Sequence, residues 1–140
     1  MPVIHVQHIA VQEGATFFLP TSKGAEIHKS VTPLKTEKVI TKNFPNSFRD
    51  TELLDYLKKN YISKLVLCGM MTNVCIDSTT RAAMDFGFEN TIIIDAVTTR
   101  NREFNGKVIP AEQVTESYLS GLNALGGLYA KLESSEKYIN

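Results

Sequence analysis

Apolar residues gather along this chain in short runs that predict β-strands. The runs cover residues 3–9, 37–42, 65–68, 91–94 and 128–132. The runs at 65–68 and 91–94 are apolar without alternation, so we expect those two strands to be buried on both faces. The last run, which follows two glycines, predicts an edge strand. Residues 10–37 show little period and predict a long irregular connection that carries short helical pieces.

Amphipathic segments that predict helices separate the later strands. Residues 51–60 place Leu53 and Leu57 on one helical face. Residues 73–86 predict a second helix, and a third begins at Pro110. Strands buried on both faces that alternate with helices are typical of a mainly parallel sheet in an α/β fold. We therefore expect one α/β domain over the whole chain.

The composition of the chain excludes some classes of molecule as binding partners. Of the 140 residues, 43% are hydrophobic and 21% are charged, and the formal net charge is +0. This balance is typical of a folded domain and argues against a nucleic-acid or anionic-membrane partner, because such binders need a basic surplus. No apolar run approaches the roughly 20 residues of a membrane helix. The N-terminus lacks the pattern of a secretory signal, and two cysteines make no disulfide framework, so we expect a cytoplasmic protein.

The residues that could carry chemistry follow the carboxyl ends of predicted strands, where ligands bind in open α/β sheets. Cys75 follows the strand at 65–68 and falls in the first turn of the next helix. Free backbone N–H groups and the positive end of the helix dipole favour an anionic thiolate there, and the same N–H groups can bind an oxyanion. Lys42 ends another strand at the same edge and can pair with that thiolate. Cys75 is therefore a candidate nucleophile.

Structural roles are the alternatives for these residues. A cysteine beside a sheet is more often buried and structural than nucleophilic, and we expect that role for Cys68, inside an apolar strand. A lysine at a strand end is ordinarily solvated. His5 and His8 point to opposite faces of one strand, and no cluster of Asp, Glu or Cys completes a ligand set, so we expect no metal. No glycine-rich phosphate loop occurs, and we expect no cofactor.

The sequence GMMTNVCIDSTTRAAMDFGF at residues 69–88, followed by Ile94-Asp95-Ala96, resembles the isochorismatase-like cysteine hydrolases. This family includes nicotinamidases and related amidases. Residues 2–6 resemble its second strand, and residues 42–48 resemble its lysine segment. The resemblance implies a three-layer α/β fold with a mainly parallel sheet flanked by helices, in the strand order 3-2-1-4-5-6.

The resemblance also implies roles for individual residues. Cys75 matches the family's nucleophile and Lys42 its catalytic lysine, which implies cleavage of a small-molecule amide through a thioester on the cysteine. It implies a cis peptide bond between Met70 and Met71, and an oxyanion hole formed by the backbone N–H groups of Met71 and Cys75. The residues implied at the substrate pocket are Phe44, Phe48 and Asn73.

The chain departs from the family at its front end. The family's first strand ends in a catalytic Asp and precedes the segment that matches residues 2–6, yet no Asp occurs before Asp50. We therefore expect a domain without the N-terminal first strand and helix, or a native start upstream of Met1. Because that strand lies in mid-sheet, its neighbours must close up or another chain must fill the gap.

Two hypotheses about function follow. One is a cysteine hydrolase with a small-molecule substrate; the other is a truncated or degenerate non-catalytic relative that acts in binding or assembly. A nucleotide-binding α/β module ranks last because no phosphate loop occurs. An unfilled gap in the sheet would expose apolar surface, which promotes association, so we expect a homo-oligomer.

Overall fold

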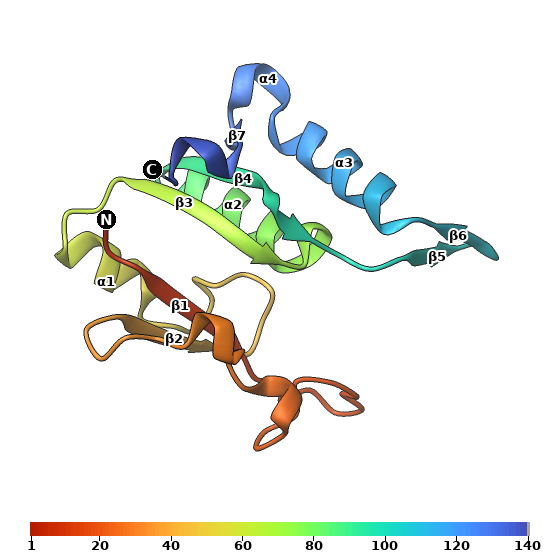
Figure 1. Ribbon diagram of the computed structural model, residues 1–140, viewed down its shortest axis with the longest axis horizontal. Helices are drawn as coiled ribbons and strands as arrows, with labels where there is room; N and C mark the ends of the chain where they lie inside the picture. The colour runs from red at the N-terminus through yellow and green to blue at the C-terminus, as the bar shows by residue number, and fades with distance from the viewer. Residues whose placement is uncertain (140) are drawn as a thin grey trace.

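The computed structural model describes residues 1–139, in which parallel strands are joined by helices (Figure 1). The strands and helices are, in chain order, β1 (Ile4–His8), β2 (Lys38–Lys42), α1 (Leu53–Lys59), β3 (Lys64–Met70), α2 (Asp77–Asp85), β4 (Glu89–Thr98), β5 (Arg102–Phe104), β6 (Lys107–Ile109), α3 (Ala111–Leu122), α4 (Ala124–Gly127) and β7 (Lys131–Glu133). Short helical turns lie at Lys23–Ala25, Lys29–Val31, Thr72–Ile76 and Ser135–Lys137. The predicted α/β fold class is confirmed, as are short helical pieces between residues 10 and 37.

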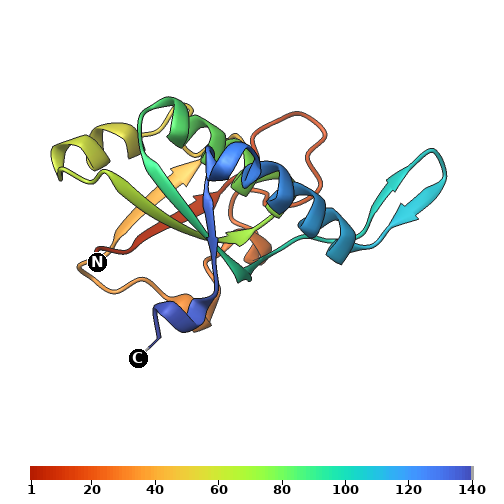
Figure 2. The ribbon, with the colours of Figure 1, turned by 90° about the horizontal axis from the view of Figure 1, so that it is seen from above.

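The strands form two separate parallel sheets. β1 pairs with β2, and β4 lies between β3 and β7. With β1 facing β3 (Figure 1), the order β2-β1 then β3-β4-β7 matches the family order 3-2-1-4-5-6 without strand 1. The run predicted as an edge strand becomes β7, at the edge of the second sheet. β5 and β6 form an antiparallel hairpin that projects from the molecule (Figure 2).

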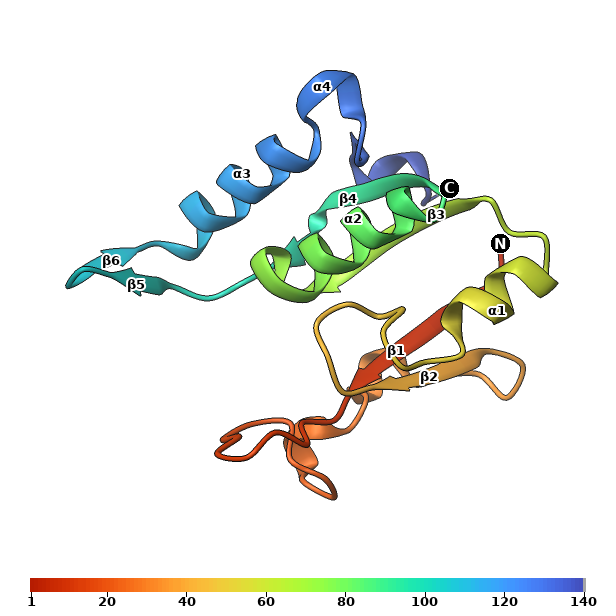
Figure 3. The ribbon, with the colours of Figure 1, turned by 180° about the vertical axis from the view of Figure 1, so that it is seen from behind.

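The two sheets remain apart between β1 and β3. No strand pairing joins β1 to β3 within residues 1–139, and a cavity of about 490 Å³ lies between them. We call it the inter-sheet cavity; β1 lines it from Ile4 to His8 and β3 from Leu65 to Met70. The two strands run in the same general direction (Figures 1 and 3). β1 and β3 therefore do not close up into one sheet.

Each sheet has its own apolar core. Leu53 and Leu57, predicted to share one face of α1, are buried against Ile40 of β2. The core of the sheet β3-β4-β7 includes Ile92 of β4 and Leu122 of α3, and both side chains are fully buried. Helices α1 and α2 cover the same side of the strands (Figure 2). Within the described part of the chain, none of the helices combines the length and the apolar character that crossing a membrane requires.

The expected burial of the strand at residues 65–68 is wrong. β3 is only half-buried over Leu65–Leu67, and Cys68 is exposed although we expect it to be buried and structural. The cause is the missing partner on one edge of β3, which leaves that edge open to the inter-sheet cavity. β4 has strands on both sides, and its Ile92 and Ile93 are buried as predicted. Ile94, expected to be buried with them, is 42% exposed.

Replacing Leu57 by alanine should destabilise the protein strongly. Leu57 is 1% exposed in the first core, and Leu→Ala at such a site costs about 2–5 kcal/mol. Leu34→Ala is the matched control, because Leu34 is 66% exposed and should cost less than about 0.5 kcal/mol. Urea unfolding followed by circular dichroism measures both. Equal losses in the two variants would contradict this assignment of the core.

Candidate active site

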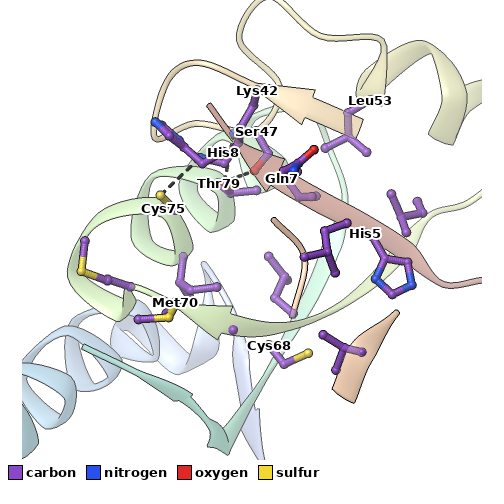
Figure 4. Close-up of a pocket in the computed structure, with 18 of the residues that line it drawn as sticks. His5, Gln7, His8, Lys42, Ser47, Leu53, Cys68, Met70, Cys75 and Thr79 are labelled. Atoms are coloured by element: carbon purple, nitrogen blue, oxygen red, sulfur yellow. Dashed lines mark hydrogen bonds between the residues drawn. The ribbon is translucent and has the colours of Figure 1, made fainter. Parts of the chain in front are cut away.

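Lys42 and Cys75 meet at the carboxyl ends of the strands. Lys42 is the last residue of β2, and Cys75 lies in the π-helical turn Thr72–Ile76 that follows β3. The Nζ atom of Lys42 lies 3.3 Å from the Sγ atom of Cys75 (Figure 4). Parallel strands place their carboxyl ends at one edge, which explains why residues 33 positions apart come together across the two sheets.

The Lys42 ammonium is buried and is held by neutral groups. The side chain is 4% exposed, and Nζ donates to the backbone oxygens of Phe44, at 2.8 Å, and Pro45, at 3.3 Å. It also donates to Nδ1 of His8, at 2.9 Å. Among residues 1–139, no carboxylate forms an ion pair with it. A buried cation without a carboxylate favours an anion nearby, and the Sγ atom of Cys75 is within hydrogen-bond distance.

His8 belongs to the site through Lys42. Burial first, and then the charge of Lys42, lower the pKa of His8 from 6.5. The imidazole is therefore neutral near pH 7, and because its Nδ1 accepts from Lys42, its own proton is assigned to Nε2. His5, on the opposite face of β1, pairs with Glu37 at 2.9 Å instead. Sequence reasoning missed His8 because a lone strand histidine gives no signal of its neighbour in space.

Hydrogen bonds connect the segment that follows β2 with helix α2. The backbone N–H of Ser47 donates to Oγ1 of Thr79 at 3.0 Å, and the two hydroxyl groups lie 2.9 Å apart. Thr79 is a residue of α2, directly beyond the turn that carries Cys75. Both side chains are buried. This contact holds the Phe44 and Pro45 carbonyls, and with them Lys42, at a set position beside the cysteine.

The backbone before Cys75 departs from regular structure. β3 contains a register shift between Leu67 and Gly69, and the peptide bond between Met70 and Met71 is cis. Met71 caps the π-helical turn, and its carbonyl accepts from the N–H groups of Val74, at 3.0 Å, and Ile76, at 3.2 Å. Cys75 thus lies in the first turn of the helical segment that leads into α2, as the pattern predicts.

A second cavity of about 390 Å³ opens beside Cys75. We call it the aromatic pocket; its lining residues are His8, Gln12, Phe17, Phe18, Asn43, Phe44, Pro45, Met71, Val74 and Cys75. Phe44 was expected there from the resemblance. Phe17 and Phe18 were not, although an apolar pair in a long surface connection is a signal that could have found them. The pocket is suited to a flat apolar group.

Phe48 and Asn73, also implied at the substrate pocket, do not line the aromatic pocket. Phe48 is buried in the first core, with its ring stacked 6.0 Å from that of Phe88, and it reaches the inter-sheet cavity rather than the aromatic pocket. Asn73 lines neither cavity; its Oδ1 accepts from Thr99 at 2.6 Å and from Arg102 at 3.3 Å. Within residues 1–139, no group of three His, Cys, Asp or Glu side chains could hold a metal ion.

Known proteins similar to this chain share one family description. The family model described as Isochorismatase domain matches residues 1–111. The chain is 41% identical over 138 residues to the isochorismatase family protein YddQ of Bacillus subtilis, covering 99% of this chain and 75% of YddQ. It is 31% identical over 97 residues to streptothricin hydrolase of Streptomyces noursei, covering 69% of this chain and 38% of that protein.

A solved structure gives the same result for the fold. The crystal structure of an isochorismatase hydrolase from Oleispira antarctica matches with a TM-score of 0.89 at 45% identity, covering 99% of this chain and 71% of that one. The chain therefore spans about three quarters of the length of these two relatives. The similarity extends over both sheets and both elements that carry Lys42 and Cys75.

Acidification should destabilise the wild type more than a variant without His8. The folded-state pKa of His8 is lowered from 6.5, so below about that pH the unfolded chain binds more protons and stability falls. His8→Asn removes this contribution, and the difference in unfolding free energy between the two proteins should shrink from pH 7 to about pH 5. His28→Asn controls for loss of an imidazole elsewhere. A wild-type advantage that stays constant over this range would contradict the assignment.

Proposed function

Because the chain belongs to the isochorismatase family, whose members are hydrolases, we propose that it is a cysteine hydrolase that cleaves a small-molecule amide. The observation that carries this proposal is the 3.3 Å contact between the buried ammonium of Lys42 and the thiol of Cys75 beside an apolar pocket. This contact places a proton-carrying amine within hydrogen-bond distance of the sulfur atom that would act as the nucleophile.

The first step is attack by the Cys75 thiolate on the amide carbonyl carbon. A C–S bond forms, the carbonyl oxygen becomes an oxyanion, and collapse of this tetrahedral intermediate breaks the C–N bond to leave a thioester. We assign the oxyanion to the backbone N–H groups of Met71 and Cys75. Their place at the start of a helical segment supports this, because N–H groups in the first turn of a helix lack intrahelical acceptors. Water then hydrolyses the thioester to a carboxylic acid and restores the thiol.

In this scheme, His8 and Lys42 accept the proton of the Cys75 thiol and later return it. Lys42 passes one proton to Nδ1 of His8 and takes the proton of the Cys75 thiol, so the thiolate faces an ammonium and His8 becomes an imidazolium. The reverse transfer delivers the proton to the leaving amine. The lowered pKa of His8 favours this return, because its imidazolium gives up a proton readily.

The aromatic pocket indicates the kind of substrate. Its walls include the rings of Phe17, Phe18 and Phe44, and its polar members Gln12 and Asn43 already donate to backbone oxygens. A neutral amide with a flat aromatic or apolar group on either side of the scissile bond fits these walls.

Cys75→Ala should abolish hydrolysis, and Lys42→Met should lower kcat/KM about 10²–10⁴-fold, because the buried cation that holds the thiolate is gone. Release of amine from a panel of neutral aromatic amides, followed by chromatography, measures this. Cys68→Ser is the matched control and should retain activity. Turnover that survives Cys75→Ala would contradict the proposal, and a panel without any turnover would favour the non-catalytic alternative.

Alkylation should separate the reactivity of the two cysteines from their accessibility. Cys68 is exposed and Cys75 only half-exposed, so access alone favours Cys68. We expect iodoacetamide near neutral pH to modify Cys75 about tenfold faster, because Lys42 stabilises its thiolate. Peptide mass spectrometry gives both rates in one sample. In the Lys42→Met variant the order should reverse; a faster reaction at Cys68 in the wild type would count against an activated Cys75.

A further inference from the structure

One arginine that lines neither cavity contacts the turn that carries Cys75. Arg102 is the first residue of β5, and its side chain extends to the π-helical turn Thr72–Ile76. Its Nη2 atom donates to Oδ1 of Asn73 at 3.3 Å and to Sδ of Met71 at 3.5 Å. No step of the proposed hydrolysis uses this arginine, although Met71 caps the turn and Asn73 belongs to it.

The guanidinium of Arg102 is held by the protein rather than by solvent. Its Nε atom is buried without a hydrogen-bond partner among residues 1–139, and the residue is half-buried overall. A buried donor that lacks an acceptor is rare in folded proteins and calls for contacts that fix the side chain in place. Those contacts are the two that Nη2 makes, because this nitrogen carries two N–H bonds at a fixed angle and can donate one to each acceptor.

Asn73 accepts hydrogen bonds from the segment that follows β4. Besides Arg102, the hydroxyl group of the buried Thr99 donates to the same Oδ1 atom at 2.6 Å. Strand pairing between β3 and β4 extends as far as Met70, which lies opposite Thr98. The two hydrogen bonds to Asn73 therefore continue the connection with β4 beyond the paired strands and into the π-helical turn.

The two contacts of Arg102 fix the backbone on which the oxyanion donors lie. The N–H groups assigned to the oxyanion belong to Met71 and Cys75, and Asn73 lies between these two residues in the chain. Nη2 links Met71 with Asn73 across this stretch. A planar guanidinium sets the relative positions of two acceptors, which the rotatable ammonium group of a lysine does less well.

We propose that Arg102 is a positioning residue for the oxyanion site. By linking Met71 with Asn73, it holds the N–H groups of Met71 and Cys75 in the geometry that receives the oxyanion. This inference rests on the proposed attack of Cys75 on a carbonyl carbon and deepens it. A displacement of about 1 Å can lower a rate about 10²-fold. Loss of the link should therefore slow reactions that form an oxyanion and leave other reactions of the thiolate unchanged.

Two electrophiles separate these effects at one sulfur atom. 4-Nitrophenyl acetate acylates a thiolate through a tetrahedral oxyanion: a C–S bond forms, the ester C–O bond breaks and 4-nitrophenolate leaves. Iodoacetamide alkylates the thiolate by displacement of iodide, without an oxyanion. The ratio of the acylation rate constant to the alkylation rate constant therefore reports on the oxyanion site alone. A Cys68→Ser background leaves Cys75 as the remaining thiol. Absorbance of 4-nitrophenolate measures acylation, and mass spectrometry measures alkylation.

Arg102→Met should lower the acylation rate constant about 10²-fold and the alkylation rate constant less than about threefold. Arg102→Lys should behave similarly, because lysine keeps the charge but not the two fixed donors. Asn73→Asp should retain the ratio, since its carboxylate oxygen still accepts from Arg102 and Thr99. The matched control is Glu103→Gln, an exposed neighbour on β5, which should change neither rate constant.

Four results would overturn the proposal. One is a ratio that survives Arg102→Met. A second is a ratio that survives Arg102→Lys but falls in Asn73→Asp, which would assign a direct effect of the charge. A third is equal loss of acylation and alkylation in both Arg102 variants, which would assign general support of the fold. The fourth is a wild-type ratio no higher than that of glutathione.

Failure of the proposed hydrolysis is distinguishable from failure of this inference. An amide panel without turnover contradicts the proposed substrate class, but both rate constants at Cys75 remain measurable. A high wild-type ratio that falls in Arg102→Met would then still assign the positioning role to this arginine.

Discussion

The buried ammonium of Lys42 is the constraint on which the site and the arrangement of the two sheets depend. It is the last residue of β2, and its three protons are shared among His8 of β1, the carbonyls of the following segment and Cys75 beyond β3. A charge that is 4% exposed must be satisfied by nearly all of these groups at once, because burial removes the alternative of water. The two sheets are not joined by strand pairing, so this contact is one of the few that holds their carboxyl ends together.

The other connection between the sheets runs through α2 and the turn before it. Ala83 of α2 belongs to the core of the first sheet, with Leu57 and Phe88, while Ile76 belongs to the core of the second. Figure 3 shows α2 against β3 and β4. The segment from Ile76 to Ala83 therefore packs on both sides of the inter-sheet cavity. Cys75, the residue before this segment, is positioned by two cores at once, which explains how the site keeps its geometry although the sheet between is interrupted.

Local pattern was enough to predict the strands of the two parallel sheets, the face of α1 and the meeting of Lys42 with Cys75. Each of these depends on periodicity or on the rule that parallel strands end at one edge. Local pattern did not predict the exposure of Cys68 or the contact between His8 and Lys42. Whether an apolar strand is covered depends on which strands lie beside it, and the neighbour of β3 is not encoded within residues 65–68. The hairpin β5–β6 was also missed, although Asn105-Gly106, both at positive φ, is a strong local signal for such a turn. Phe17 and Phe18 reach the site only through the course of a long irregular connection.

The two cavities are not independent of each other. His8, Phe18, Met71 and Cys75 line both the inter-sheet cavity and the aromatic pocket. A ligand in either cavity would therefore contact the same side chains, and it would exclude water from the side of Cys75 that faces it. Exclusion of water strengthens the attraction between Lys42 and a thiolate, because that attraction grows as the local dielectric falls. Ligands of the two cavities would thus interact through the same few side chains, and by linkage the effect of each on the binding of the other is equal.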